Sequence, residues 1–421
     1  MSDTRPSDAL IAPVAAAIER RWDAEIEFLR ALVRQPSDNP PGDCTPHAEV
    51  TARLLESLGF TVERHAVPDE VVQAAGMISC TNLIVRKSFG ANSADGGPVV
   101  ALNAHGDVVP PGDGWTHDPY GGEVVDGVMY GRGVAVSKSD FATFAFALLA
   151  LEAVAERLSG TVELHLTYDE ETGGGIGPAW ILSQGLTRPD YAISAGFSHA
   201  IVTAHNGVVH LEVTVRGRSA HAAKPDEGAD ALEAMTAILQ ALYVERRSYP
   251  ERVSAIPGIG HPNMTVGLIE GGINTNVVPD RCTIRLDRRM TPEEDPAAVE
   301  ARLRTVIEGA VAAHDGVSVD IARVLLASPL RCLDGAEKLI DPVRHHARRL
   351  LAEEVPVEGV PLYTDARLYA EAGVPTIGYG AGPRTFLDAN GHRADEKLVL
   401  SDLRVATEVV ALAVAEVLVR S

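Results

Sequence analysis

Two short apolar runs, each followed at once by histidine or acidic residues, place the strongest limit on the fold of this chain. Residues 98–104 (PVVALNA) precede His105, and residues 161–168 (TVELHLTY) precede Asp169 and two glutamates. Apolar runs of this length are typical of buried parallel strands. Because ligands bind beyond the carboxyl ends of the strands in α/β sheets, we expect both polar segments at one edge of a sheet.

The order of the remaining segments predicts two domains. Strands that alternate with helices indicate an α/β catalytic domain with a central, mostly parallel sheet. Between residues 207 and 324 the pattern changes to strand, helix, two strands, helix and strand, which predicts an inserted β-α-β-β-α-β (ferredoxin-like) unit. The insertion leaves a discontinuous catalytic domain of residues 1–206 and 325–421. A length of 421 residues agrees with this division, because single cores rarely grow beyond about 250–300 residues.

Charge and composition narrow the class of partner and the compartment. The chain has 37 basic and 58 acidic side chains and a net charge of −21, which argues against binding to nucleic acid or to anionic membranes. Its apolar stretches are too short to span a membrane, and its first residues lack the pattern of a signal peptide. The four cysteines form no closely spaced pair, so we expect free thiols and a cytoplasmic location.

Three polar segments contain residue types that suit metal-assisted chemistry. His105 with Asp107 two residues later suits a metal ligand and a carboxylate that orients it, although such a pair alone is more often a hydrogen-bonded turn. In Asp169-Glu170-Glu171, one carboxylate can bind a cation while its neighbour takes a proton. Taken alone, His392 would be an ordinary surface histidine.

In order and spacing, these segments resemble the M20 family of metallopeptidases and amidohydrolases, which includes desuccinylases, deacetylases, aminoacylases and carboxypeptidases. The resemblance is carried by residues 105–115, 118–120, 131–133 (GRG), 169–174 (DEETGG), 217–221 (GRSAH), 276–279 (NVVP), 364–367 (TDAR) and His392. It implies that the inserted unit is a lid that carries a homodimer interface. It also implies a small, amino-acid-like substrate.

The resemblance also implies a role for each matching residue of the catalytic domain. His105 resembles the ligand of one metal, and Asp107 resembles the residue that orients it. Glu170 resembles the general base that activates water. Glu171 and His392 resemble ligands of a second metal.

The lid residues carry implied roles as well. His221 resembles the lid histidine that reaches the partner subunit's site and stabilises an oxyanion. Asn276 and Arg289 resemble lid groups that hold a substrate carboxylate.

Two of the family's five ligand positions are lost in this sequence. The position that bridges both metals is Val136, and a second ligand position, usually glutamate, aligns with Gly196. Catalytic zinc usually has about three protein ligands and a water. We therefore expect at most one divalent ion, zinc, manganese or cobalt, and leave open that none binds.

Three nearby residues could compensate for the lost ligands. Asp140 follows Val136 by one helical turn, and His199 follows Gly196 by three residues. The alternatives are a helix N-cap for Asp140 and a hydrogen-bonded loop histidine for His199. Lys138 keeps its family position and would place a cation near the vacated bridging site, where it could bind substrate.

Three functions remain open from the sequence. The first is hydrolysis of an N-acyl or N-carbamoyl amide in a small carboxylate-bearing amino-acid derivative, with Glu170 as base and at most one metal. The second is a metal-independent isomerase, lyase or cyclising enzyme that uses Glu170 on the same scaffold. The third is a non-catalytic small-molecule binding protein.

Overall fold

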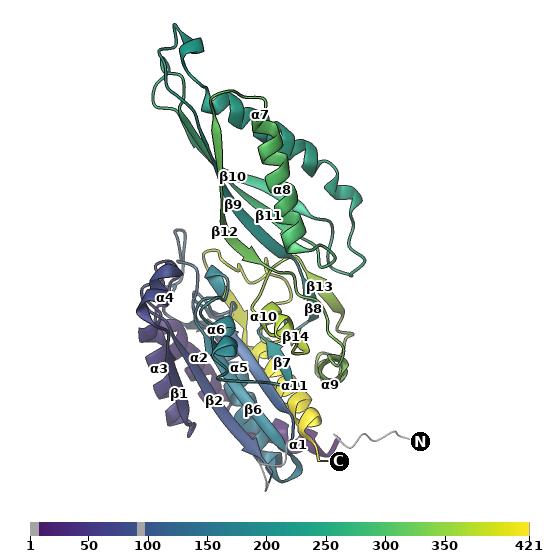
Figure 1. The fold of residues 1–421 in the computed structure, drawn as a ribbon. Coiled ribbons are helices and arrows are strands. Elements are labelled where there is room, and N and C mark those ends of the chain that lie inside the picture. Colours follow the sequence, from purple (N-terminus) through teal and green to yellow (C-terminus); the bar gives the residue numbers. More distant parts are fainter. Residues whose placement is uncertain (1–7, 91–96, 421) are drawn as a thin grey trace. The chain divides into compact units, whose positions relative to one another are not determined.

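The computed structural model describes residues 8–90 and 97–420, which divide into two compact units (Figure 1). Unit 1 comprises the described residues up to Thr203, residues 332–357 and residues from Thr364 onward. Unit 2 comprises residues 204–331 together with 358–363. The short return of residues 358–363 to unit 2 is a feature that the sequence pattern did not indicate.

Unit 1 is a mixed α/β domain. Its strands are β1 (Val62–Ala66), β2 (Thr81–Phe89), β3 (Val99–His105), β4 (Glu123–Val125), β5 (Val128–Tyr130), β6 (Gly160–Thr167), β7 (Tyr191–Ser194), β14 (Thr376–Gly378) and β15 (Lys397–Val399), and β8 (Ile201–His205) and β13 (Val357–Val360) cross the unit boundary. Its helices are α1 (Asp8–Glu19), α2 (Trp22–Arg34), α3 (Thr45–Ser57), α4 (Asp69–Ala74), α5 (Lys138–Leu151), α6 (Pro178–Ser183), α9 (Glu337–Leu351), α10 (Ala366–Glu371) and α11 (Leu400–Leu418), with 3-10 turns η2 (Glu152–Arg157) and η3 (Glu170–Thr172).

The large sheet confirms the predicted fold class. Its eight strands lie in the order β1-β2-β6-β3-β7-β14-β8-β13. The central neighbours β6, β3, β7 and β14 pair in parallel, whereas β1 with β2, β2 with β6, and β8 with β14 pair antiparallel. A parallel centre with antiparallel flanks is common in large α/β sheets. A separate small sheet, β15-β5-β4, lies in the same unit.

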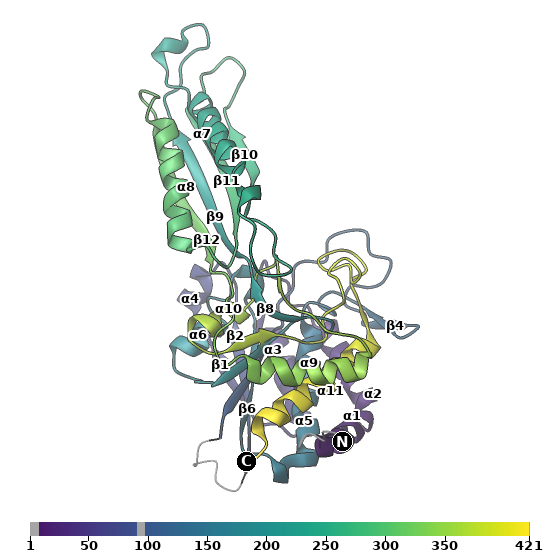
Figure 2. The same cartoon turned by 90° about the vertical axis from the view of Figure 1, so that its right-hand side faces the viewer.

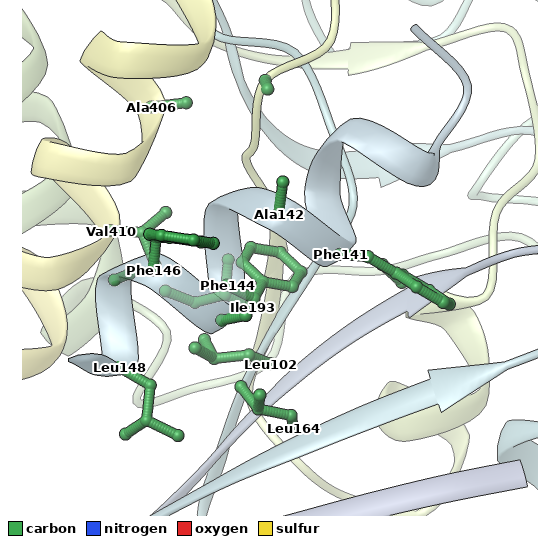
Figure 3. Packing of buried hydrophobic residues seen from close by; sticks show 14 of the residues in the cluster. Leu102, Phe141, Ala142, Phe144, Phe146, Leu148, Leu164, Ile193, Ala406 and Val410 are labelled. Atoms are coloured by element: carbon green, nitrogen blue, oxygen red, sulfur yellow. The ribbon is translucent and has the colours of Figure 1, made fainter. Parts of the chain in front are cut away.

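Helix α5 is the centre of the unit 1 core. All fourteen of its residues are buried, as expected for a helix that is apolar on every face. Figure 3 shows Phe144 of α5 beside the strand residues Leu102 and Ile193, and Phe146 beside Val410 of α11. Four residues, Val136 among them, join the GRG segment to the N-terminus of α5, so this packing also holds the loop that carries Val136.

Unit 2 has the predicted β-α-β-β-α-β order. Its elements are β9 (Gly207–Arg216), α7 (Ala231–Arg246), β10 (Asn263–Gly271), β11 (Arg281–Met290), α8 (Pro296–Val311) and β12 (Ser318–Ala327), with 3-10 turns η4 (Pro225–Glu227) and η5 (Tyr249–Glu251). The antiparallel sheet has the order β10-β11-β9-β12, and Figures 1 and 2 show α7 and α8 packed beside it. Alternate residues of β9, from Val209 to Val215, are buried in one cluster with residues of both helices.

Two features concern the chain as a whole. None of the helices in the described residues is long and apolar enough to span a bilayer. The four cysteines are free thiols, and Cys332 alone among them is exposed.

We predict that Phe144→Ala destabilises unit 1 by about 3–5 kcal/mol, because it removes a fully buried ring and leaves a cavity in a packed core. The three tryptophans, Trp22, Trp115 and Trp180, all lie in unit 1, so their fluorescence during urea unfolding reports on this unit. Ile78→Ala is the control, since Ile78 is 60% exposed and its loss should change stability by less than about 0.5 kcal/mol. Equal unfolding midpoints for the two variants would contradict the assignment of α5 as the core helix.

Candidate functional site

The pairing of two parallel strands brings the first two polar segments together. Strand β3 ends at His105, which lies opposite Thr167, the last residue of β6. The chain then continues from β6 into Asp169 and the 3-10 turn that begins with Glu170 and Glu171. Both segments therefore leave the same edge of the sheet, as the sequence predicts.

Four of the predicted residues form one cluster. One ligand atom from each of His105, Glu170 and Glu171 lies within 4.8 Å of the other two. His105 Nε2 lies 4.0 Å from Glu170 Oε2, and His392 Nε2 lies 3.3 Å from Glu171 Oε1. His105 is buried and Glu170 and Glu171 are largely covered, whereas His392 is 40% exposed at its side chain. The cluster thus has one open side, next to His392.

Asp107 is fully buried and contacts both His105 and the backbone of Glu170 and Glu171. Its side chain accepts hydrogen bonds from Asn39 Nδ2 (2.9 Å) and from the amides of Glu170 (3.3 Å) and Glu171 (3.2 Å). His105 Nδ1 lies 3.0 Å from the Asp107 carbonyl oxygen and 3.4 Å from its carboxylate. A proton on Nδ1 leaves Nε2 as the atom that faces the glutamates, which is the orientation of a metal-binding imidazole.

The cluster contains more acidic than basic groups. Burial raises the pKa of Glu170 to about 8, and the negative charges of Glu171 and Asp107 add to this shift against the opposing effect of His105. Burial and the charge of Asp107 raise the pKa of Asp169 to about 7. Burial, with Glu170 and Asp169, also holds the pKa of Asp365 well above its usual range. A site of this kind favours either protons or a bound cation.

The donor set does not fit a two-metal centre. Val136 packs against the hydrophobic core, and its amide donates to Glu396 at 3.2 Å. At Gly196 a Cβ atom would lie 2.6 Å from the Tyr379 nitrogen and 2.7 Å from the Gly378 carbonyl carbon, so no side chain fits there on this backbone. Of the ligands expected from the sequence, His105 and Glu171 lie in the one group of ligand atoms that could hold an ion among the described residues, and His392 lies beside Glu171.

The two candidate substitute ligands are engaged elsewhere. Asp140 is buried and accepts a hydrogen bond of 2.6 Å from the Ala381 amide, and burial raises its pKa to about 7. His199 Nδ1 lies 2.9 Å from Glu353 and its Nε2 lies 3.7 Å from Asp402. Neither residue belongs to the cluster of three ligand atoms, so this geometry does not favour the ligand role that the sequence left open for them.

Lys138 is also turned away from an open site. It is fully buried, and its Nζ donates to the carbonyls of Leu32 (3.2 Å) and Gln35 (3.0 Å) at the C-terminal end of α2. Burial lowers its pKa to about 7. These bonds satisfy the last carbonyls of a helix, so the geometry favours a structural role over the predicted contact with substrate.

The three predicted lid residues lie in unit 2. His221 is exposed, and the amide after it, that of Ala222, donates to the Asn276 carbonyl at 2.9 Å. Arg289, on β11, forms a two-pronged contact with Asp287, with Nε–Oδ1 of 2.9 Å and Nη2–Oδ2 of 3.0 Å. His221 and Asn276 are therefore close to each other, and Arg289 has an acidic partner that the sequence did not reveal.

Sequence reasoning missed several supporting residues. Asn39 binds Asp107, Asp365 adds a buried carboxyl to the acidic group, and Arg132 pairs with Glu396 in the interior. Arg132 lies within the GRG segment that carried the family resemblance, and Glu396 follows His392 by four residues, which was the available signal. Asn39 lies in a loop of prolines and glycine, and nothing in its local sequence pointed to the site.

Comparison with known proteins agrees with this geometry. Residues 101–416 match the peptidase family M20/M25/M40. Succinyl-diaminopimelate desuccinylase of Rhizorhabdus wittichii is 28% identical over 409 residues, covering 91% of this chain and 95% of the relative. Acetylornithine deacetylase of Myxococcus xanthus is 31% identical over 381 residues, covering 88% and 91%.

A solved structure shows the same fold. A dinuclear metal-binding peptidase of the M20 family from Bacillus subtilis superposes with a TM-score of 0.68 at 18% identity, covering 95% of this chain and 99% of that one. The family match extends over most of the chain, and the resemblance seen in the sequence is confirmed. This protein belongs to the peptidase family M20/M25/M40 and is a hydrolase.

Proposed function

We propose that the protein hydrolyses an N-acyl or N-carbamoyl amide bond in a small amino-acid derivative that carries a carboxylate. The observation that carries the proposal is the cluster of Glu170 with His105 and Glu171, next to His392. The names of the relatives, a desuccinylase and a deacetylase, support the choice of an amide of an amino-acid derivative.

Glu170 is the proposed general base. It takes a proton from water as the water oxygen attacks the amide carbon, and it returns that proton to the nitrogen as the C–N bond breaks. The products are a free amine and, from an N-acyl substrate, a carboxylic acid; an N-carbamoyl substrate gives carbamic acid instead, which breaks down to carbon dioxide and ammonia. Asp107 binds the amide of Glu170 and the ring of His105, so it fixes the position of the base relative to His105.

The proposal includes at most one divalent ion, held by His105, Glu171 and His392. Such an ion would polarise the amide carbonyl and acidify water. The excess of buried carboxylates supports a cation, while Val136 and the closed position at Gly196 argue against a second one. Zinc, manganese and cobalt all suit a mixed histidine and carboxylate set.

Unit 2 is proposed to act as a lid and a homodimer interface. His221 is exposed on it and is proposed to stabilise the oxyanion in the site of the partner subunit. Asn276 and Arg289 are proposed to hold the substrate carboxylate, with Arg289 exchanging its contact with Asp287 for the substrate. Two-pronged contact with a carboxylate is the strongest arrangement for arginine.

The loss of two ligand positions supports one other candidate. A metal-independent enzyme could use the same Glu170 as an acid or base on a substrate carbon or leaving group. Its raised pKa, about 8, favours this role because a protonated carboxyl can also donate. Metal content separates this candidate from the proposed hydrolase, and turnover of any substrate separates both from a binding protein.

Glu170→Gln should reduce turnover by about 10²–10⁴-fold, because the amide cannot accept the proton of water. The rate of N-acyl amino-acid hydrolysis, followed by release of the amine, measures the effect. Glu152→Gln is the control, since Glu152 forms an exposed ion pair with Lys87 and should retain full activity. Undiminished turnover in Glu170→Gln would remove the base from the mechanism.

Elemental analysis of the purified protein after incubation with zinc, manganese or cobalt should give no more than one equivalent of metal. Val136→Asp should still give no more than one, because the tight contact at Gly196 leaves no room for the other missing ligand. His392→Ala should lower the metal content, because only two donors then remain. Two equivalents in the unaltered protein would contradict the single-ion site.

Affinity for cobalt should rise as the pH is raised from 6 to 9. The pKa of Glu170 is raised to about 8 and that of Asp169 to about 7. Below these pH values the two carboxyls near the proposed ligands are protonated and lack the negative charge that attracts a cation. Above them the protons dissociate and the charge favours binding. Titration calorimetry in buffers of different ionisation enthalpy measures the protons released on binding. Binding at pH 7 without proton release would show that these carboxyls are already ionised.

A further inference from the structure

We propose that Glu396 is a positioning residue: through its buried contacts with Arg132 and the backbone of residues 135–136, it holds His392 against Glu171. This inference deepens the proposed function, because it concerns the same site. Neither Glu396 nor Arg132 is among the donor residues of the cluster.

The Glu396 carboxylate gathers three donors from a single segment. Its Oε2 accepts from Arg132 Nη1 at 2.5 Å. Its Oε1 accepts from the amides of Ala135 (3.0 Å) and Val136 (3.2 Å). Glu396 is 0% and Arg132 1% exposed at the side chain. A carboxylate bound in this way has little freedom to move, since each displacement breaks a bond that water cannot replace.

Arg132 is itself held on its other side. Its Nη2 donates to the Pro111 carbonyl at 3.1 Å, and its guanidinium lies 5.3 Å from the centre of the Trp115 ring. Residues 111–115 follow His105 along the chain. The ion pair therefore joins the loop after one proposed ligand to the loop that carries another.

Hydrogen bonds join the two ends of the loop that contains His392, so a movement of Glu396 would also move the histidine. The Lys397 amide donates to the Ala389 carbonyl at 2.9 Å, which ties together the two ends of the loop. Asn390 Nδ2 donates to the Asp395 carbonyl at 3.1 Å. His392 lies inside this loop, three residues from Asp395.

A second anchor acts on the same loop from outside. The Asp395 carboxylate accepts from the Thr116 amide and hydroxyl, each at 2.8 Å, and from the His117 amide at 3.1 Å. The Gly131 amide donates to the Glu396 carbonyl at 2.9 Å. The His392 ring, in contrast, is 40% exposed and lies in edge contact with Phe386, with ring centres 5.3 Å apart. The orientation of this exposed ring therefore depends on how firmly its loop is held.

The buried Arg132–Glu396 pair is better explained by its effect on the position of His392 than by a contribution to the stability of the fold. A buried ion pair contributes little net stability, because desolvation of both charges offsets their attraction. Residues that orient metal ligands from behind commonly change metal affinity by about 10–100-fold when altered. The location of Glu396, between the loops of His105 and His392, matches that role.

Glu396→Gln is the test, made in the full-length protein with histidines labelled by ¹⁵N. The variant keeps the shape of the side chain and an oxygen for the two amides, but it loses the charge that holds Arg132. We expect the ring signals of His392, assigned with His392→Ala, to shift or broaden, while those of His65 stay unchanged. Glu25→Gln is the matched control: Glu25 is equally buried in unit 1 and pairs with Thr407, so this variant should leave the His392 signals in place.

Cobalt affinity gives the second measurement. Glu396→Gln should weaken binding about 10–100-fold, and it should cause no further loss in a protein that already carries His392→Ala, because it acts through that residue. Unchanged His392 signals in a folded Glu396→Gln protein, or losses that add in the double variant, would overturn the proposal. If the unaltered protein neither binds cobalt nor hydrolyses amides, the proposed function fails, and the ¹⁵N spectra still decide whether Glu396 positions His392.

Discussion

The parallel pairing of β3 with β6 is the interaction on which the site depends. Because His105 is opposite Thr167 at the end of both strands, the residues that follow leave the sheet together. Asp107 then binds the amides of Glu170 and Glu171 and joins the two loops. A shift of this register by one residue would turn His105 to the other face of the sheet. The buried helix α5 packs on these strands and stabilises that register.

Close packing also surrounds Gly196 and Asp140, two positions that the sequence analysis singled out. The turn at Gly196 lies directly on the backbone of Tyr379, and Asp140 fills the space beside Gly380, where a Cβ would lie 2.1 Å from its carboxylate oxygen. Asp140 thereby accepts a hydrogen bond from the backbone of the neighbouring loop at Ala381. The acidic groups of the site are Glu170, Glu171, Asp107, Asp169 and Asp365. Among the four clustered residues and Asp107, the exposed one is His392.

The supporting residues bind the loops that carry the cluster. Asn39 donates to Asp107, and the Arg132–Glu396 pair links residues 111 and 135–136 to the segment that follows His392. These contacts use side chains from segments that are far apart in the sequence. The loops that carry the cluster are thus held by buried hydrogen bonds and one ion pair.

The sequence by itself determined the fold class, the order of the lid-like unit and the residues of the cluster, because strand periodicity and the family pattern are local and ordered along the chain. It could also show that Val136 and Gly196 cannot supply side-chain ligands. Only the tertiary structure showed which partners Lys138, Asp140 and His199 contact, since all of these partners are distant in sequence. Lys138 binds the end of α2 and Asp140 binds the Ala381 amide. His199 contacts Glu353 and Asp402. The hydrogen-bond partners of a buried polar group depend on which loops lie close together in the folded chain, and a local sequence pattern contains no information about that proximity.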